Sequence, residues 1–122
     1  MAKKILVVDD DELVLIAVEE LLSSGNHEVT TAPGGKEALE SVASSRFDLV
    51  MLDVIMPEMD GYTLCKEIRG REEYAEVPII FLTAKASEED RKRGEEVGAS
   101  LYLPKPISPQ RLTELVEQAL GE

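Results

Sequence analysis

The sequence has a single cysteine, few basic residues and no long apolar run. Cys65 alone excludes an internal disulfide and is compatible with a reducing compartment. No segment has the length of a membrane span or the character of a secretion signal, so we expect a cytoplasmic protein. The 13 Lys and Arg residues stand against 25 Asp and Glu residues, which gives a formal net charge of −12. Nucleic acid and anionic membranes bind basic surfaces, so we expect neither as a direct partner.

The rest of the composition is that of one folded domain. At 122 residues, of which 43% are apolar, the chain can fill one hydrophobic core and is short for two. It contains no internal repeat, no low-complexity tract and no linker-like segment. We therefore expect residues 1–122 to form a single domain.

Three short apolar runs each lead directly into polar residues. They are residues 5–8 before Asp9 and Asp10, residues 49–52 before Asp53, and residues 79–82 before Thr83. Continuous apolar runs of this length are typical of strands that are buried on both faces of a parallel sheet. Each of these strands would therefore deliver polar groups at its carboxyl end.

Strand patterns alternate with helical patterns along the whole chain. We expect strands at 4–8, 28–32, 48–52, 79–82 and 100–103, and helices at 12–23, 36–44, 62–69, 88–97 and 109–120. Such alternation predicts an α/β fold with a doubly wound, five-stranded parallel sheet and five helices. The apolar runs should be central and the two less apolar strands should be edges. This gives the strand order 2-1-3-4-5, which is the order of flavodoxin-like folds.

In such a sheet the binding crevice lies at the carboxyl ends of strands 1 and 3, where the strand order reverses. That crevice would hold Asp9, Asp10 and Asp53. Three neighbouring carboxylates repel one another unless a cation joins them, and Mg²⁺ takes oxygen ligands with only a few carboxylates. The sequence therefore predicts a magnesium site. The simpler interpretation is that these acids only cap helices and turns.

Lys105 and Thr83 extend this group. Lys105 follows the last strand between two prolines, and its bond to Pro106 is a candidate cis peptide. An ammonium group beside a metal stabilises phosphoryl oxygens, and an ionised Asp53 is a nucleophile that needs no general base. The group predicts phosphoryl transfer. The alternatives are a solvated surface lysine and a strand-end threonine with satisfied hydrogen bonds.

Other segments carry weaker expectations. The helix at 88–97 has almost no apolar stripe, so packing should hold it weakly. Residues 70–77 have the composition of a polar loop, and His27 has the setting of a surface residue in a loop without a catalytic role. Cys65 falls on the apolar face of a helix and should be a small core residue.

Four motifs stand at these strand ends: Val7-Val8-Asp9-Asp10, Asp53 followed by Met56-Pro57 and Asp60-Gly61, Thr83-Ala84, and Lys105-Pro106. Together they resemble the receiver domain of bacterial two-component response regulators over essentially the whole chain. The resemblance implies that Asp53 accepts a phosphoryl group from a histidine kinase or a phosphotransfer protein. It implies that Asp9, Asp10, Asp53 and the backbone carbonyl of Ile55 bind Mg²⁺. Lys105 would lie beside the phosphoryl group, and Thr83 and Tyr102 would act as the switch.

The resemblance also implies how the domain passes its signal to a partner and how long the phosphorylated state persists. The Thr83 hydroxyl would move to the phosphoryl group and vacate space for Tyr102 to turn inward. A downstream protein, or an effector domain of a longer regulator, would read the last two helices and the last strand. Such a domain is no enzyme on other substrates, but it assists its own phosphorylation and dephosphorylation. Ile55 and Lys85 would flank the phosphoryl group, and neither can accept a proton from an attacking water, so we expect slow dephosphorylation.

Two other classes compete with a signalling switch. A phosphohydrolase that forms an aspartyl phosphate generally has its two acids two residues apart and a cap segment over the substrate. Here Asp9 and Asp10 are adjacent, and there is no cap insertion. A flavin-binding module would have a Ser-, Thr- or Gly-rich phosphate loop after the first strand, where Asp9, Asp10 and Asp11 would repel a phosphate.

Overall fold

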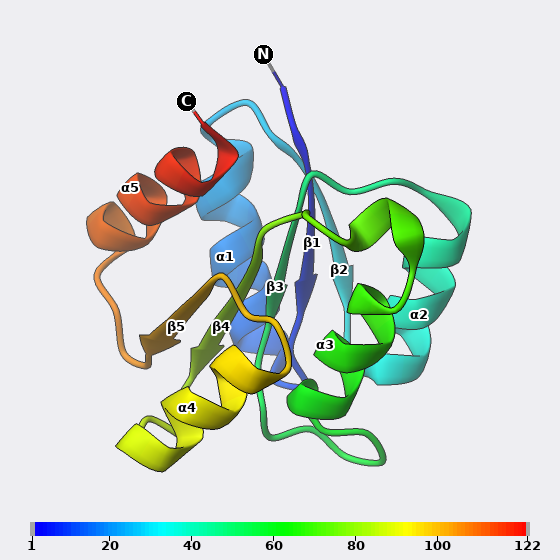
Figure 1. Ribbon diagram of the computed structural model, residues 1–122. Coiled ribbons are helices and arrows are strands. Elements are labelled where there is room, and N and C mark those ends of the chain that lie inside the picture. The colour runs from blue at the N-terminus through cyan, green and yellow to red at the C-terminus, as the bar shows by residue number, and fades with distance from the viewer. Residues whose placement is uncertain (1, 122) are drawn as a thin grey trace.

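The strands of the protein form one parallel sheet in the order β2-β1-β3-β4-β5 (Figure 1). A computed structural model describes residues 2–121. The strands are β1 (Lys4–Val8), β2 (Glu28–Ala32), β3 (Leu49–Leu52), β4 (Ile79–Thr83) and β5 (Leu101–Pro104). The predicted fold and strand order are confirmed, and strand boundaries differ from the predicted ones by at most one residue.

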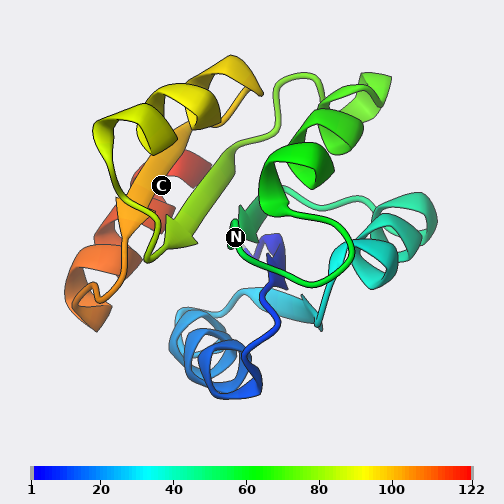
Figure 2. The same cartoon turned by 90° about the horizontal axis from the view of Figure 1, so that it is seen from below.

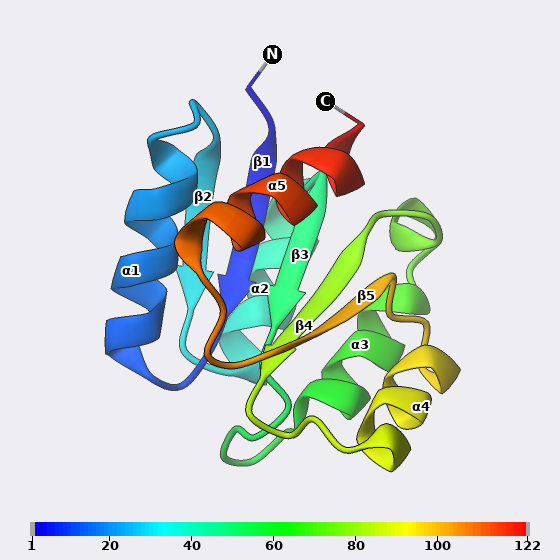
Figure 3. The ribbon, with the colours of Figure 1, turned by 90° about the vertical axis from the view of Figure 1, so that its left-hand side faces the viewer.

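Helices cover both faces of the sheet. Figure 3 shows α1 (Glu12–Ser23) and α5 (Pro109–Leu120) side by side in front of the sheet. The opposite face carries α2 (Gly35–Ser44), α3 (Gly61–Arg69) and α4 (Glu88–Glu96). Within residues 2–121, no helix combines the length and apolar content that crossing a bilayer requires.

The alternation of side chains along the central strands creates two cores. In β1, Ile5 and Val7 face α1 and α5, whereas Leu6 and Val8 face α2 and α3. All residues of β3 and β4 are buried. Each fully buried aliphatic side chain stabilises the fold by roughly 1.5–3 kcal/mol through removal from water. The central strands therefore fix the positions of their carboxyl ends.

Helix caps fix where several helices begin. The carboxylate of Asp11 accepts from the N–H of Leu13 at the start of α1, and that of Asp60 accepts from Thr63 at the start of α3. Ser108 caps α5, and Pro109 follows at the first helical position. Asp11, the acid that follows the predicted cluster, is thus a helix cap.

Helix α4 has the weak anchoring that its sequence predicts. Gly94 is its only buried residue. A capping box between Ser87 and Asp90 begins the helix, so local hydrogen bonds rather than packing define its first turn. Its position therefore depends on a few contacts, which include the Tyr102 ring described below.

Two expectations about polar segments are wrong in part, because each segment carries a buried polar residue. Residues 70–77 contain a 3₁₀ turn, η1 (Glu72–Tyr74), and Tyr74 is fully buried with its hydroxyl donating to the carbonyl of Ser45 at 3.1 Å. His27 is also buried. Its Nδ1 accepts from the N–H of Lys3 at 3.3 Å, so its Nε2 donates to Glu117 at 2.7 Å. These partners are remote in sequence, which is why a local pattern misses them.

The expectation for Cys65 is confirmed. The thiol is fully buried in α3, and its Sγ donates to the carbonyl of Val97 at 3.4 Å. Burial raises the pKa of the Cys65 thiol to about 11. The thiol is therefore a protonated core group at neutral pH.

Candidate functional site

The carboxyl ends of the parallel strands meet at one edge of the sheet, which Figure 2 views end-on. Asp9 follows β1, Asp53 follows β3, Thr83 ends β4 and Lys105 follows β5. The topology therefore brings together residues that are up to 96 positions apart. This convergence is what the strand order predicts.

Three carboxylates form a cluster at the β1 and β3 ends. Asp9, Asp10 and Asp53 each place one oxygen within 4.8 Å of the others. Asp9 and Asp53 are buried, and Asp10 is exposed. A group of carboxylate oxygens that is open to solvent on one side fits a hard divalent cation such as Mg²⁺, which keeps several of its waters.

Lys105 bridges the two buried carboxylates. Its Nζ donates to Oδ2 of Asp9 and to Oδ2 of Asp53, each at 2.8 Å. Burial opposes the charge on Lys105, but its bonds to Asp53 and Asp9 outweigh this and raise its pKa above the usual value. Burial raises the pKa of Asp9, and the hydrogen bond from Lys105 offsets this only in part. A second cation beside Asp9 would relieve the remaining cost of burying its charge.

Close backbone packing orients Asp53. Its Oδ1 accepts from the N–H of Val54 at 2.6 Å, so the carboxylate is held at both oxygens. Gly61 approaches so closely that a Cβ there would overlap the carbonyl oxygen of Asp53. The Asp60-Gly61 pair therefore serves two purposes, since Asp60 caps α3 and Gly61 lets that helix begin against the β3 end.

Thr83 and Ile55 lie near the carboxyl ends of β4 and β3. Thr83 is fully buried, and its Oγ1 accepts from the N–H of Lys85 at 3.2 Å. The carbonyl of Thr83 accepts from the N–H of Lys105 at 2.9 Å, which ties the β4 end to the β5 end. Ile55 follows Asp53 by two residues, with its side chain 59% exposed. The Lys105–Pro106 peptide is cis.

Tyr102 lies on β5 beside the β4–α4 loop. Its ring packs on that of Phe81 with centroids 5.4 Å apart, and its hydroxyl donates to the carbonyl of Lys85 at 2.6 Å. The hydroxyl also lies 2.8 Å from that of Tyr62. Burial, and then the hydrogen bond to Tyr62, raise the pKa of Tyr102, so its phenol stays protonated.

Tyr62 is the residue that the sequence interpretation missed. It follows Asp60-Gly61 in α3, is almost fully buried, and has no sequence feature that pairs it with a residue 40 positions away. The only available signal was an aromatic residue at the start of a helix that packs beside the predicted switch.

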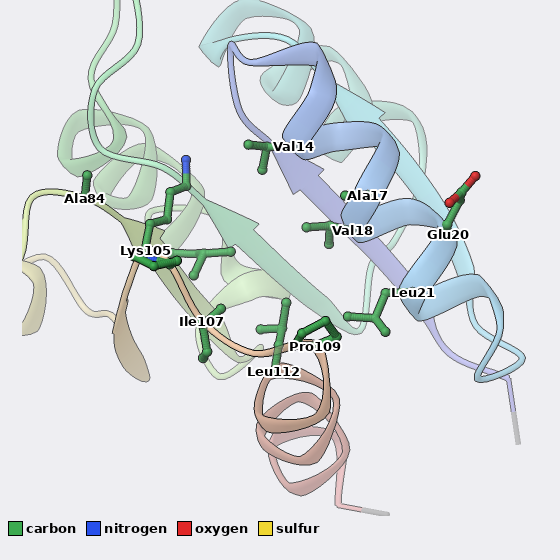
Figure 4. A pocket seen from close by; sticks show the side chains of 12 residues that line it. Val14, Ala17, Val18, Glu20, Leu21, Ala84, Lys105, Ile107, Pro109 and Leu112 are labelled. Carbon is green, nitrogen blue, oxygen red and sulfur yellow. The ribbon is translucent and has the colours of Figure 1, made fainter.

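A groove adjoins this site between α1 and the segment from β5 to α5 (Figure 4). Its volume is about 860 Å³, and the stem of Lys105 forms part of its wall. In Figure 4 the apolar side chains of Val14, Val18 and Leu21 face those of Ile107 and Leu112 across the groove. The same lysine thus contacts both the carboxylates and an apolar surface.

Comparisons with known proteins agree on one family. Residues 5–117 match the sequence profile of the response regulator receiver domain. The chain is 40% identical over 120 residues to the alkaline phosphatase synthesis transcriptional regulatory protein PhoP of Bacillus subtilis, covering 98% of this chain and 49% of PhoP. The chain spans about half the length of the curated relatives that it matches.

Solved structures share the fold of this chain. Chemotaxis protein CheY4 of Vibrio cholerae superposes with a TM-score of 0.94 at 35% identity, covering 98% of this chain and 99% of CheY4. The receiver domain of sensor histidine kinase PA1611 from Pseudomonas aeruginosa superposes with a TM-score of 0.91 at 33% identity, covering all of both chains. The PA1611 domain has a magnesium ion coordinated in its active site cleft.

Proposed function

Since the chain belongs to the response regulator receiver domain family, and is thus a signalling domain of two-component systems, we propose that Asp53 is its phosphoacceptor. The donor is a histidine kinase or a histidine phosphotransfer protein. The observation that carries this proposal is the bridge of Lys105 between Asp53 and Asp9, because it places a cation where phosphoryl charge would develop. Residues 1–122 form one receiver domain.

In the proposed transfer, an oxygen of Asp53 forms a bond to phosphorus while the bond from phosphorus to the donor's imidazole nitrogen breaks. The electron pair stays on that nitrogen, and the product is an aspartyl phosphate. Lys105 turns its ammonium group from Asp53 to a phosphoryl oxygen and stabilises the charge there. Asp9, Asp10, Asp53 and the carbonyl of Ile55 would hold Mg²⁺, which when bound neutralises charge on the phosphoryl oxygens.

The proposed output begins at Thr83. Its hydroxyl shifts toward the phosphoryl oxygens and moves the loop that includes Lys85. Tyr102 follows because its hydroxyl is bonded to the carbonyl of Lys85. A partner then reads the surface of α4, β5 and α5, which is exposed on its outer side.

The partners are inferred from these features. Phosphorylation by a histidine kinase would require the domain to lie in the cytoplasm. A separate protein, or an effector domain in a longer regulator, reads its state, as the transcriptional role named for PhoP supports. The net charge of −12 supports readout through protein rather than through direct contact of this domain with nucleic acid or membrane. A phosphohydrolase is not favoured, because the relatives are response regulators.

The test is incubation with acetyl phosphate and Mg²⁺, followed by intact-mass measurement. We expect one phosphoryl group per chain, no gain when EDTA is present, and little turnover of acetyl phosphate. Asp53→Asn is the matched control, since it keeps the shape of the side chain and should gain no mass. Equal gains in the wild type and in Asp53→Asn would refute the assignment.

A further inference from the structure

The hydroxyl of Tyr62 joins three elements on the α4 side of the sheet. Its ring is almost fully buried and lies 5.5 Å from that of Phe81 on β4. Its hydroxyl lies 3.1 Å from the carbonyl of Asp90 in α4 and 2.8 Å from the hydroxyl of Tyr102 in β5. A buried phenol must find partners for its hydroxyl, and here both partners belong to the proposed output surface.

The protons of the two hydroxyls define the direction of this network. Tyr102 donates at 2.6 Å to the carbonyl of Lys85, which can only accept. The carbonyl of Asp90 lies farther from the Tyr62 hydroxyl, at 3.1 Å, so we assign the bond between the two phenols to the proton of Tyr62. That proton is shared with the carbonyl of Asp90, so Tyr62 is the donor to both neighbours. Loss of its hydroxyl would leave Tyr102 with the single anchor at Lys85.

The network leads back to Thr83, the proposed switch residue. Lys85 follows Thr83 by two residues, and its N–H donates to the Thr83 hydroxyl. A displacement of Thr83 is thus transmitted to Lys85 and then to Tyr102. The Tyr62 hydroxyl also bonds to the carbonyl of Asp90. Both Tyr102 and α4 are therefore attached to the same buried residue of α3. This connection compensates for the scarcity of apolar contacts in α4.

We propose that Tyr62 is a positioning residue that anchors Tyr102 and α4 to α3 and thereby couples phosphorylation to α4 and β5. The proposal rests on the proposed function, because it describes how the same site is read out. It assigns Tyr62 no contact with the phosphoryl group. Removal of one hydrogen bond shifts a two-state equilibrium roughly fivefold, so the anchored position of Tyr102 should become correspondingly less populated.

The chain suits a direct test because it has three tyrosines. Tyrosine labelled with ¹³C in the ring would give one set of NMR signals for each, and Tyr102→Phe would assign its own. We expect Tyr62→Phe, which keeps the buried ring, to shift or broaden the Tyr102 signal. Tyr74→Phe is the matched control, since Tyr74 is an equally buried phenol that bonds to Ser45 and Phe47 instead.

The second readout is the response to beryllofluoride with Mg²⁺, followed by backbone amide signals. We expect Tyr62→Phe to bind beryllofluoride but to show smaller shifts in α4 and β5 than the wild type or Tyr74→Phe. An unchanged Tyr102 signal in Tyr62→Phe, or a full amide response despite an altered Tyr102 signal, would overturn the proposal. A wild type without any beryllofluoride response would instead count against the proposed function. In that case the Tyr102 signal still tests the anchoring.

Discussion

Nζ of Lys105 donates to Oδ2 of Asp53 at 2.8 Å across 52 positions of the sequence. The same Nζ also serves Asp9, so one cation offsets two buried carboxylates. A buried charge without a partner lowers the free energy of unfolding. The stability of the protein should therefore depend on which cation neutralises the two carboxylates.

Lys105→Ala should therefore destabilise the protein when no divalent cation is present. The side chain of Lys105 is 23% exposed, so we expect a loss of about 1–3 kcal/mol, which is below the range for fully buried pairs. Mg²⁺ should recover part of this loss. Urea unfolding with EDTA or with Mg²⁺ measures both effects, and the exposed Lys36 provides the control Lys36→Ala. Equal stability of both variants in EDTA would contradict the prediction.

Asp10→Ala should reduce the stabilisation of the wild type by Mg²⁺. Binding to the folded state alone contributes about 2.7 kcal/mol when free Mg²⁺ is about 100 times its Kd. Loss of one oxygen ligand raises the Kd and lowers this gain. Thermal unfolding across a Mg²⁺ series measures it. Glu12→Ala removes the same charge outside the cluster, so its Mg²⁺ response should match that of the wild type. An unchanged response in Asp10→Ala would mean that Asp10 is not a ligand.

The prediction of a long-lived phosphoprotein concerns Ile55 and Lys85. The exposed Ile55 cannot hydrogen-bond a water, and the Nζ of Lys85 is paired with Asp90 at 2.7 Å. Ile55→Asn with Lys85→Glu should speed dephosphorylation, since a water-orienting bond of ~1.4 kcal/mol in the transition state means roughly tenfold in rate. The decay of phosphoprotein in time gives the rate.

Because Lys85→Glu also removes the partner of Asp90, Ile55→Asn alone should be measured beside the double variant. Leu13→Asn is the control, as Leu13 is another exposed apolar residue. If neither the single nor the double variant decays faster than this control, Ile55 and Lys85 do not govern the lifetime.

Gly94→Ala should destabilise the protein although it improves helix propensity. In an open helix the change from Gly to Ala stabilises by about 1 kcal/mol. Here the new Cβ would lie 2.5 Å from Cδ2 of Tyr102, so the ring must leave its place and lose the bond to Tyr62. In a Tyr102→Ala background the clash is gone, and Gly94→Ala should stabilise. Urea unfolding of the wild type, the two single variants and the double variant measures whether the effect of Gly94→Ala on the free energy of unfolding changes sign. If Gly94→Ala stabilised the protein in both backgrounds, the Tyr102 ring would move aside without loss of stability, and the prediction would be wrong.

Glu117→Ala should cost about 1–3 kcal/mol, because it leaves Nε2–H of the buried His27 without its acceptor. The exposed Glu114 lies on the same helix, and Glu114→Ala should stay within about 0.5 kcal/mol of the wild type. Chemical unfolding measures both. Similar values for the two variants would show that water replaces Glu117 as the partner of His27.

The strands and the ends that carry the site could be predicted because their signals are local. A run such as Leu49–Leu52 is apolar at every position, and Asp53 follows it directly. Once the strand order is inferred, the residues at the carboxyl ends are brought together by topology. The same reasoning placed Lys105 near Asp53 without any information on side-chain conformation.

The misses share a different cause. His27, Tyr62 and Tyr74 are polar residues that are buried because each meets a specific partner from a remote segment. Composition and periodicity report the average environment of a segment, but they do not reveal such a pairing. A polar stretch around Tyr74 thus resembled an open loop, although one phenol within it completes the core.

The sparse anchoring of α4 has a consequence for how new specificity arises. Since Gly94 is its only buried residue, nearly all of its side chains can be replaced without disturbing the core. Mutations that alter recognition by a partner therefore need not be accompanied by compensating changes in the interior. A duplicated copy of this domain could acquire a different downstream partner through substitutions on one helix, while the residues that carry its phosphorylation chemistry stay unchanged.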